Sequence, residues 1–90
     1  MLQSDYQIHL TSRAAKDLKK FKSPQKARII SALLKLKAFP NQPQSKTLIH
    51  HHTSAQYRLR IGDYRILYDV YDQDKVVLIF RLGHRKDIYR

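Results

Sequence analysis

A two-residue turn signal, Gly62–Asp63, stands between two runs of alternating apolar residues, and it constrains the fold more than any other feature of the chain. Alternation with a period of two predicts strands over residues 57–61 and 64–71. A two-residue loop joins such strands into a hairpin, so Arg60 is expected to pair directly with Arg65. A loop longer by one residue would shift this register and turn every side chain to the other face.

The same pairing sorts the side chains of the hairpin onto two faces, because successive residues of a strand point in opposite directions. One face carries apolar and aromatic residues, and we expect it to meet the helices. The other face carries Arg58, Arg60 and Arg65. Like charges that face each other across a strand pair cost up to about 1 kcal/mol, so the opposed Arg60 and Arg65 destabilise the hairpin by themselves.

The chain before this hairpin predicts one strand and two amphipathic helices. Residues 3–10 alternate as a strand does. Thr11 or Ser12 is a good N-cap for the first helix. Ser23, which is followed by a proline, is expected to cap a second helix that Pro40 ends.

A last strand is expected from Val76 to Leu82, ended by Gly83 and antiparallel to the second strand of the hairpin. The predicted fold class is therefore α+β: an N-terminal strand, a two-helix hairpin, then a three-stranded antiparallel meander, with the helices packed on one face of the sheet. Ninety residues suggest a single domain over 1–90. The face of the last strand stays open, since a loop of either two or three residues fits 72–74.

Lysine and arginine outnumber acidic residues 18 to 7, which gives a formal net charge of +11. Such an excess predicts a polyanionic partner, nucleic acid or an acidic protein. The chain has no cysteine and no glutamate, so disulfides, thiol nucleophiles and a glutamate general base are excluded. No apolar run could span a bilayer and the N-terminus does not resemble a signal peptide, so we expect a cytoplasmic protein with no membrane partner.

The end of the sheet nearest the Gly62–Asp63 turn is expected to gather positive charge, because the last strand returns there beside Arg65. This placement predicts a concave site with several guanidinium groups, a histidine and a tyrosine, but no carboxylate base. Guanidinium groups bind phosphates and could neutralise the phosphorane that forms when an RNA 2′-hydroxyl attacks its own phosphate. A tyrosine with a lowered pKa could take the 2′ proton, although the same cluster could also merely bind a polyanion.

No metal site is expected in this chain. His50, His51 and His52 are contiguous, and three neighbouring histidines can rarely all face one metal ion.

The segments Tyr57–Val70 and Val76–Tyr89 resemble the RelE branch of the RelE/ParE toxin superfamily, whose length and order of elements match essentially the whole chain. The resemblance implies a type II toxin that needs no metal or cofactor and cuts messenger RNA in the ribosomal A site. It also implies a cognate RelB-like antitoxin that holds the toxin inactive. The implied catalytic residues are Arg60, Arg65, Arg85 and Tyr89, and the expected RNA-binding residues are Arg58, Arg81, His84 and Lys86.

The resemblance also implies individual roles. Arg65 stands where the family has its phosphate-stabilising arginine, and Arg85 matches an arginine proposed as general acid or leaving-group stabiliser. Tyr89 matches a tyrosine proposed as base or as a stacking platform, although the segment between these last two residues is shorter here than in the best-known member. Two other functions stay open: a ParE-like inhibitor of DNA gyrase that acts by binding protein, and a non-catalytic basic domain that binds nucleic acid.

Overall fold

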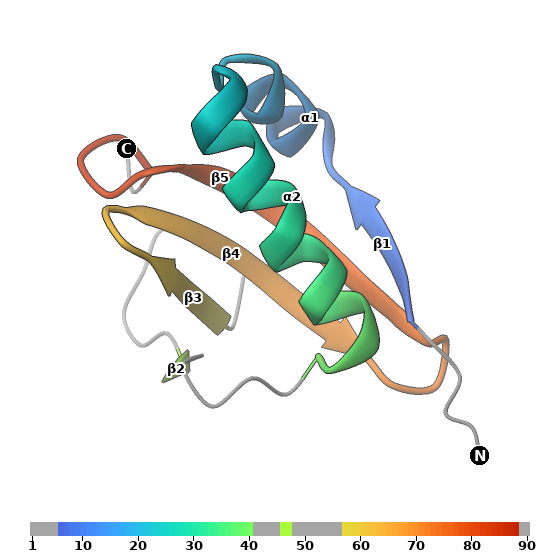
Figure 1. Cartoon of the computed structure of the whole chain (residues 1–90). Helices are drawn as coiled ribbons and strands as arrows, with labels where there is room; N and C mark the ends of the chain where they lie inside the picture. Colours follow the sequence, from blue (N-terminus) through green and yellow to red (C-terminus); the bar gives the residue numbers. More distant parts are fainter. Residues whose placement is uncertain (1–5, 41–45, 48–56, 89–90) are drawn as a thin grey trace.

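The computed structural model describes residues 6–40, 46–47 and 57–88. Within these residues two helices cover one face of a five-stranded sheet (Figure 1). The α+β class predicted from the sequence is confirmed, with one strand, β2, that was not predicted. The elements in chain order are β1 Gln7–Leu10, α1 Ser12–Lys19, α2 Ser23–Ala38, β2 Lys46–Thr47, β3 Tyr57–Ile61, β4 Tyr64–Tyr71 and β5 Val76–His84.

The strands lie side by side in the order β1-β5-β4-β3-β2. β1 pairs in parallel with β5, and every other neighbouring pair is antiparallel. The predicted meander of β3, β4 and β5 is therefore confirmed. A parallel pair needs a long crossover connection, and here the chain passes through both helices and three strands between β1 and β5.

Both helices begin close to their predicted starts. The Thr11 side chain accepts the Ala14 N–H at 3.1 Å and caps α1, as predicted. Ser23 is itself the first residue of α2, and Lys22 takes the capping position without a side-chain hydrogen bond. The predicted cap was therefore wrong by one residue. The proline in the first turn explains the early start, because its fixed φ already suits the helix.

The two faces of the sheet differ as predicted. The half-buried residues Tyr57, Ile61, Tyr64 and Val70 pack against the helix-side core. A second, smaller cluster of Leu67, Ile88 and Phe80 lies outside this core. No described helix is long and apolar enough to cross a membrane. The buried residues of the main core are Ala14, Ile29, Ala32, Leu33, Leu36, Leu59, Ile66, Tyr68, Val77, Ile79 and Leu82.

A register shift between β4 and β5 settles the face of the last strand. Leu67 pairs with Arg81 and Tyr68 pairs with Ile79, so Phe80 is an extra residue on β5. Such a β-bulge changes the parity of the residues that follow it. Core residues therefore lie an odd number of positions apart on the two sides of the bulge, which no period-two pattern would predict.

β5 also runs further than predicted. Gly83 pairs with Arg65, and His84 pairs with Tyr64, so the strand ends at His84 rather than before Gly83. The glycine continues the strand because β4 still offers it a pairing partner. The last strand therefore reaches the β3–β4 turn.

The beginning of β1 is tied to the β4–β5 turn at the opposite end of the sheet. The Tyr6 hydroxyl donates a hydrogen bond to the Asp72 carboxylate at 2.7 Å, and the Lys75 ammonium lies 5.1 Å from the centre of the Tyr6 ring. The hydrogen bond to Asp72 raises the pKa of Tyr6 above 10.0, with desolvation and the negative charge of Asp72 adding to the effect. The predicted strand is confirmed over residues 7–10, and residues 3–5 lie outside the described part.

The predicted two-residue turn joins β3 to β4. Gly62 has a φ of 59°, a left-handed conformation that glycine adopts without steric cost. Arg60 pairs with Arg65, so the register that depended on this loop length is confirmed. The turn thereby fixes which residues of β3 and β4 face each other at this end of the sheet.

We expect Gly62→Ala to lower the free energy of unfolding by about 1 kcal/mol, because a side chain is strained at this φ. Gly83→Ala is the matched control, since its new Cβ would stand 3.7 Å from Ile88 Cδ1, an ordinary contact. Urea unfolding of both variants measures the difference. Equal effects of the two substitutions would contradict a left-handed turn at Gly62.

Candidate active site

The β3–β4 turn is the point where the cationic residues of three elements meet. Arg60 on β3 lies directly opposite Arg65 on β4, and Gly83 on β5 lies on the other side of Arg65. The turn that follows β5 comes back to the same place, because the Arg85 N–H donates to the Asp63 carbonyl at 2.8 Å. The structure thus brings together three of the four predicted catalytic residues.

The backbone of this turn holds the Arg65 side chain in place. Its Nη1 donates to the carbonyls of Gly62 at 2.8 Å and Tyr64 at 2.9 Å, and the residue is only 8% exposed. Arg60, directly opposite, is exposed. The two arginines therefore differ in kind: one is a fixed buried charge that braces the turn, and the other reaches solvent.

Arg85 and Lys86 are exposed, as a phosphate-binding role requires. The Arg85 Nε lies 3.8 Å from the Asp63 carboxylate, and both side chains are more than half exposed, at 56% and 65%. An exposed pair at this distance contributes little to stability and can exchange its partner easily. The turn thus brings one carboxylate, that of Asp63, beside the cluster, where the sequence predicted no carboxylate base.

Arg28 is a further cation at this turn that the sequence did not reveal. It belongs to α2, whose basic residues are typical of a solvated helix face. Its Nη2 lies 3.1 Å from the position that a Cβ would take at Gly62, so its guanidinium rests against the turn. Only the packing of α2 across β3 brings it there, and no signal in the local sequence separates it from the neighbouring lysines.

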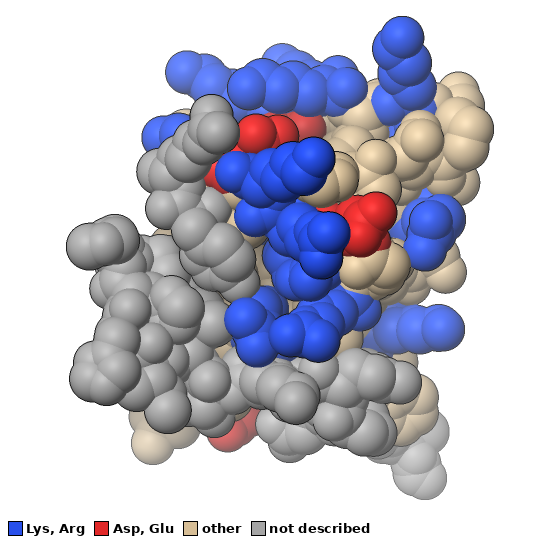
Figure 2. Space-filling view, turned by 90° about the vertical axis from the view of Figure 1, so that its left-hand side faces the viewer, with Lys and Arg blue, Asp and Glu red and all other residues tan. Residues whose placement is uncertain are grey.

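Viewed from the side of these turns, the molecule presents a band of lysine and arginine side chains with a few acidic atoms beside it (Figure 2). The exposed residues Arg28, Arg60, Arg85 and Lys86 come from α2, β3 and the turn after β5. The electrostatic field of this side is therefore positive and attracts an anionic ligand.

His84 lies on the other face of the sheet. As the partner of Tyr64 it points to the helix side, where the two rings meet edge to face at 5.6 Å. Its Nδ1 accepts the Lys86 N–H at 3.1 Å, so the proton of the neutral ring is on Nε2. With Asp17, Tyr64 and Asp87 it lines a cavity of about 210 Å³. The expectation that His84 shares one concave site with Arg65 was wrong, because the bulge at Phe80 sets the opposite face.

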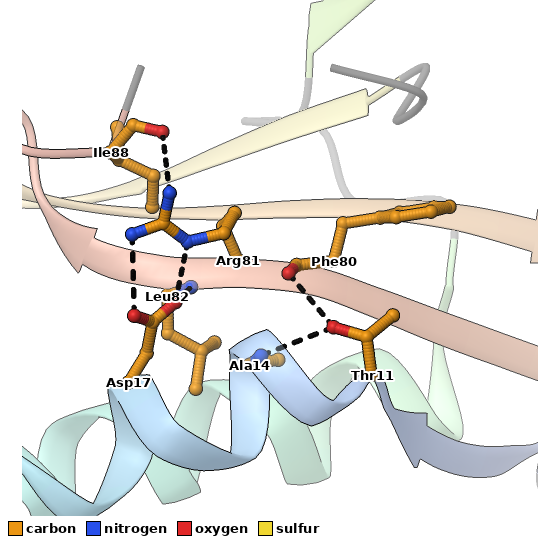
Figure 3. Close-up of polar contacts among 7 residues, drawn as sticks. All are labelled: Thr11, Ala14, Asp17, Phe80, Arg81, Leu82 and Ile88. Atoms are coloured by element: carbon orange, nitrogen blue, oxygen red, sulfur yellow. Dashed lines mark hydrogen bonds and ion pairs between the residues drawn. The ribbon is translucent and has the colours of Figure 1, made fainter. Parts of the chain in front are cut away.

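Arg81 is engaged in an ion pair inside the fold (Figure 3). Its Nε and Nη2 donate to the two carboxylate oxygens of Asp17 at 2.7 and 3.3 Å, and its Nη1 donates to the Ile88 carbonyl at 3.5 Å. The side chains of Arg81 and Asp17 are only 15% and 5% exposed. Arg81 therefore links β5 to α1 and to the segment after β5. This position favours a structural role over the RNA contact that was expected.

Asp17 and Thr11 extend the pairing of β5 beyond the end of β1. The Asp17 carboxylate also accepts the Leu82 N–H at 3.0 Å, and the Thr11 hydroxyl donates to the Phe80 carbonyl at 3.0 Å (Figure 3). Both side chains satisfy backbone groups of β5 where no β1 residue pairs with them, which a buried backbone requires.

Two predicted site residues remain, Arg58 and Tyr89. Arg58 is half-buried on β3, where it pairs with Leu67, two positions before Arg60. Tyr89 lies outside the described residues, as do His50–His52. The described residues contain no group of three side chains that could hold a metal ion.

Comparison with known proteins identifies the family. The family model described as "ParE toxin of type II toxin-antitoxin system, parDE" matches residues 8–89. The chain belongs to the RelE/ParE toxin superfamily. Toxin RelG of Mycobacterium tuberculosis is 30% identical to this toxin over 89 residues, which cover 94% of this chain and 97% of RelG.

Solved structures agree with the RelE-like branch. The archaeal RelE–RelB complex from Pyrococcus horikoshii superposes with a TM-score of 0.74 at 27% identity, over 92% of this chain and 98% of that chain. The isolated E. coli RelE toxin superposes with a TM-score of 0.73 at 22% identity, over 88% and 83% of the two chains. The family, the branch and the fold class predicted from the sequence are all confirmed for this toxin.

We expect Arg81→Met to lower the free energy of unfolding by about 3 kcal/mol, because it leaves the Asp17 carboxylate buried without its counter-charge. Arg81→Lys should restore little of this loss, since an ammonium cannot reproduce the fork of the guanidinium. Arg85→Met is the control: its pair is exposed, so the loss should stay below about 1 kcal/mol. Urea unfolding measures all three, and near-equal stabilities would contradict an anchoring role for Arg81.

Proposed function

We propose that this toxin is a ribosome-dependent endoribonuclease that cleaves messenger RNA in the A site and so inhibits translation. The observation that carries the proposal is the convergence of Arg60, Arg65 and Arg85 on the Gly62–Asp63 turn, from three different elements. The proposed reaction is attack of an RNA 2′-hydroxyl on the adjacent phosphate, with departure of the 5′ oxygen. No metal or cofactor takes part in it.

The proposed chemistry is electrostatic stabilisation of the phosphorane. Arginine stays charged at any working pH, and its planar guanidinium binds two phosphate oxygens at once. Arg60 and Arg85 are exposed and would contact these oxygens, whereas the buried Arg65 would add a fixed positive charge beneath them. Preorganised charges of this kind supply a large share of the rate enhancement in many enzymes.

Proton transfer is assigned to the segment that follows β5. Tyr89 is the proposed base or stacking platform, and Arg85 the proposed general acid or leaving-group stabiliser, both by resemblance to the family. Arg58 and Lys86 would hold the flanking RNA. His84 is better placed to order the turn than to transfer a proton, because its Nδ1 binds the Lys86 N–H and its ring packs on Tyr64.

The proposed partners are the ribosome, messenger RNA and a RelB-like antitoxin, in the cytoplasm. Solved RelE–RelB complexes from Pyrococcus horikoshii and from Mycobacterium tuberculosis, the latter named RelBE2, are 27% identical to this toxin in the matched chain, which supports an antitoxin partner. A net charge of +11 favours docking on ribosomal RNA. Since the ribosome would orient the substrate, free RNA should be cut poorly.

A second candidate is a gyrase inhibitor of the ParE kind, because the matching family model carries the ParE description. It requires a protein-binding surface and no nuclease residues. Arg85 discriminates between the two candidates, since its side chain lies at the arginine cluster and contributes little to the stability of the fold.

We expect Arg85→Ala to reduce cleavage of messenger RNA in a cell-free translation reaction by about 100-fold, the usual loss on removal of one charge-stabilising donor. Primer extension should place the wild-type cuts within A-site codons and only when ribosomes are present. Lys37→Ala, an exposed charge at the other end of α2, should cleave like the wild type. Intact messenger with blocked supercoiling in a parallel gyrase assay would favour the ParE-like function instead. Intact messenger with normal gyrase activity would favour a non-catalytic domain that binds nucleic acid.

A further inference from the structure

A groove of about 520 Å³ opens between α2 and β3, next to the β3–β4 turn. Its floor is apolar and is formed by Ala32, Leu59 and Ile61. Arg28 and Lys35 from α2 and Arg60 from β3 stand along it. Among the described residues that line this groove, every charged side chain is positive.

The cations are spaced along the groove rather than gathered at one point. Arg28 and Lys35 are seven residues apart on α2, which places them two turns, or roughly 10 Å, apart along the helix axis. A single small anion cannot contact both. A ligand with regularly spaced negative charges and flat apolar rings between them would match the two cations and the floor, and a single-stranded nucleic acid has these features.

The groove is continuous with the arginine cluster. Arg28 rests against Gly62, whose carbonyl accepts a hydrogen bond from Arg65. Arg60 belongs to both places, because it lines the groove and pairs with Arg65 across the hairpin. A nucleic-acid strand with one phosphate at the arginine cluster would therefore place its neighbouring nucleotides in the groove along α2.

The opposite side of α2 has a different character. There Ile30 and Leu34, which are 41% and 60% exposed, line a groove toward β1. Exposed large apolar side chains of this kind are what a protein partner covers. None of the large exposed hydrophobic residues in the described part lines the α2–β3 groove, so that groove favours a nucleic acid over a protein segment.

We infer that the α2–β3 groove binds the messenger strand beside the cleavage position. Arg28 and Lys35 hold two of its phosphates, and a ribose or base lies on the floor at Ala32 and Leu59. This inference rests on the proposed nuclease function and extends its substrate site from the scissile phosphate to the flanking nucleotides. It assigns a substrate-binding role to two residues of α2 that the sequence does not single out.

The test measures affinity of the toxin for ribosomes programmed with messengers that carry a 2′-deoxy nucleotide at the cleavage position and end at different lengths on either side of it. We expect added nucleotides on one side to tighten binding of the wild type. Arg28→Ala and Lys35→Ala should each remove most of this gain, roughly tenfold, because each loses a charged phosphate contact. Arg28→Lys should keep part of it, and Lys37→Ala, on the same helix toward β1, should keep all of it.

Each other outcome overturns the inference in a recognisable way. A loss of affinity that is the same for every messenger length would assign the groove to ribosomal RNA. Unchanged ribosome binding together with weaker binding of the purified antitoxin would make it a protein-docking surface. Failure of the proposed nuclease function is distinguishable from failure of this inference. The first would leave an unmodified messenger uncut, whereas the second is measured as affinity for 2′-deoxy messengers, which needs no cleavage. Thermal unfolding checks that each variant is folded.

Discussion

The register of the β3–β4–β5 sheet is the constraint on which the rest of this structure depends. The left-handed Gly62 closes a two-residue turn, and this turn sets Arg60 opposite Arg65. β5 then places Gly83 beside Arg65, on the side away from β3, so the end of β5 reaches the same turn. A shift by one residue would turn the apolar side chains to solvent and the arginines toward the helices. The hydrophobic core and the arginine cluster therefore depend on the same register.

The cations at this end of the sheet repel each other, and the fold engages them in different ways. Arg81 is paired with the buried carboxylate of Asp17, whereas the Nη1 of the buried Arg65 donates to the backbone carbonyls of Gly62 and Tyr64. Arg60 and Arg85 stay near solvent. Two of the cations that the proposed phosphate site requires, Arg60 and Arg85, are therefore accessible to a ligand.

Sequence reasoning succeeded where the physics is local and failed where it depends on packing. The turn, the hairpin register and the apolar face follow from period-two alternation and from the glycine, and they were confirmed. The face of His84 could not be predicted, because one extra residue at Phe80 reverses the parity of β5. Neither the anchoring of Arg81 by Asp17 nor the approach of Arg28 to the turn could be predicted, since both partners lie far apart along the chain.

The amino-acid sequence alone is enough to predict the α+β class and the concentration of arginines at one end of the sheet, because alternation, turn residues and charge are properties of neighbouring residues. The family follows from the resemblance of two segments, Tyr57–Val70 and Val76–Tyr89, to known toxins. The tertiary structure decided the rest. It selected which arginines are buried and which are exposed, moved the histidine to the helix side and brought a residue of α2 to the turn. These outcomes depend on how the helices lie across the sheet, and that arrangement is fixed by side-chain packing between distant segments rather than by any local pattern.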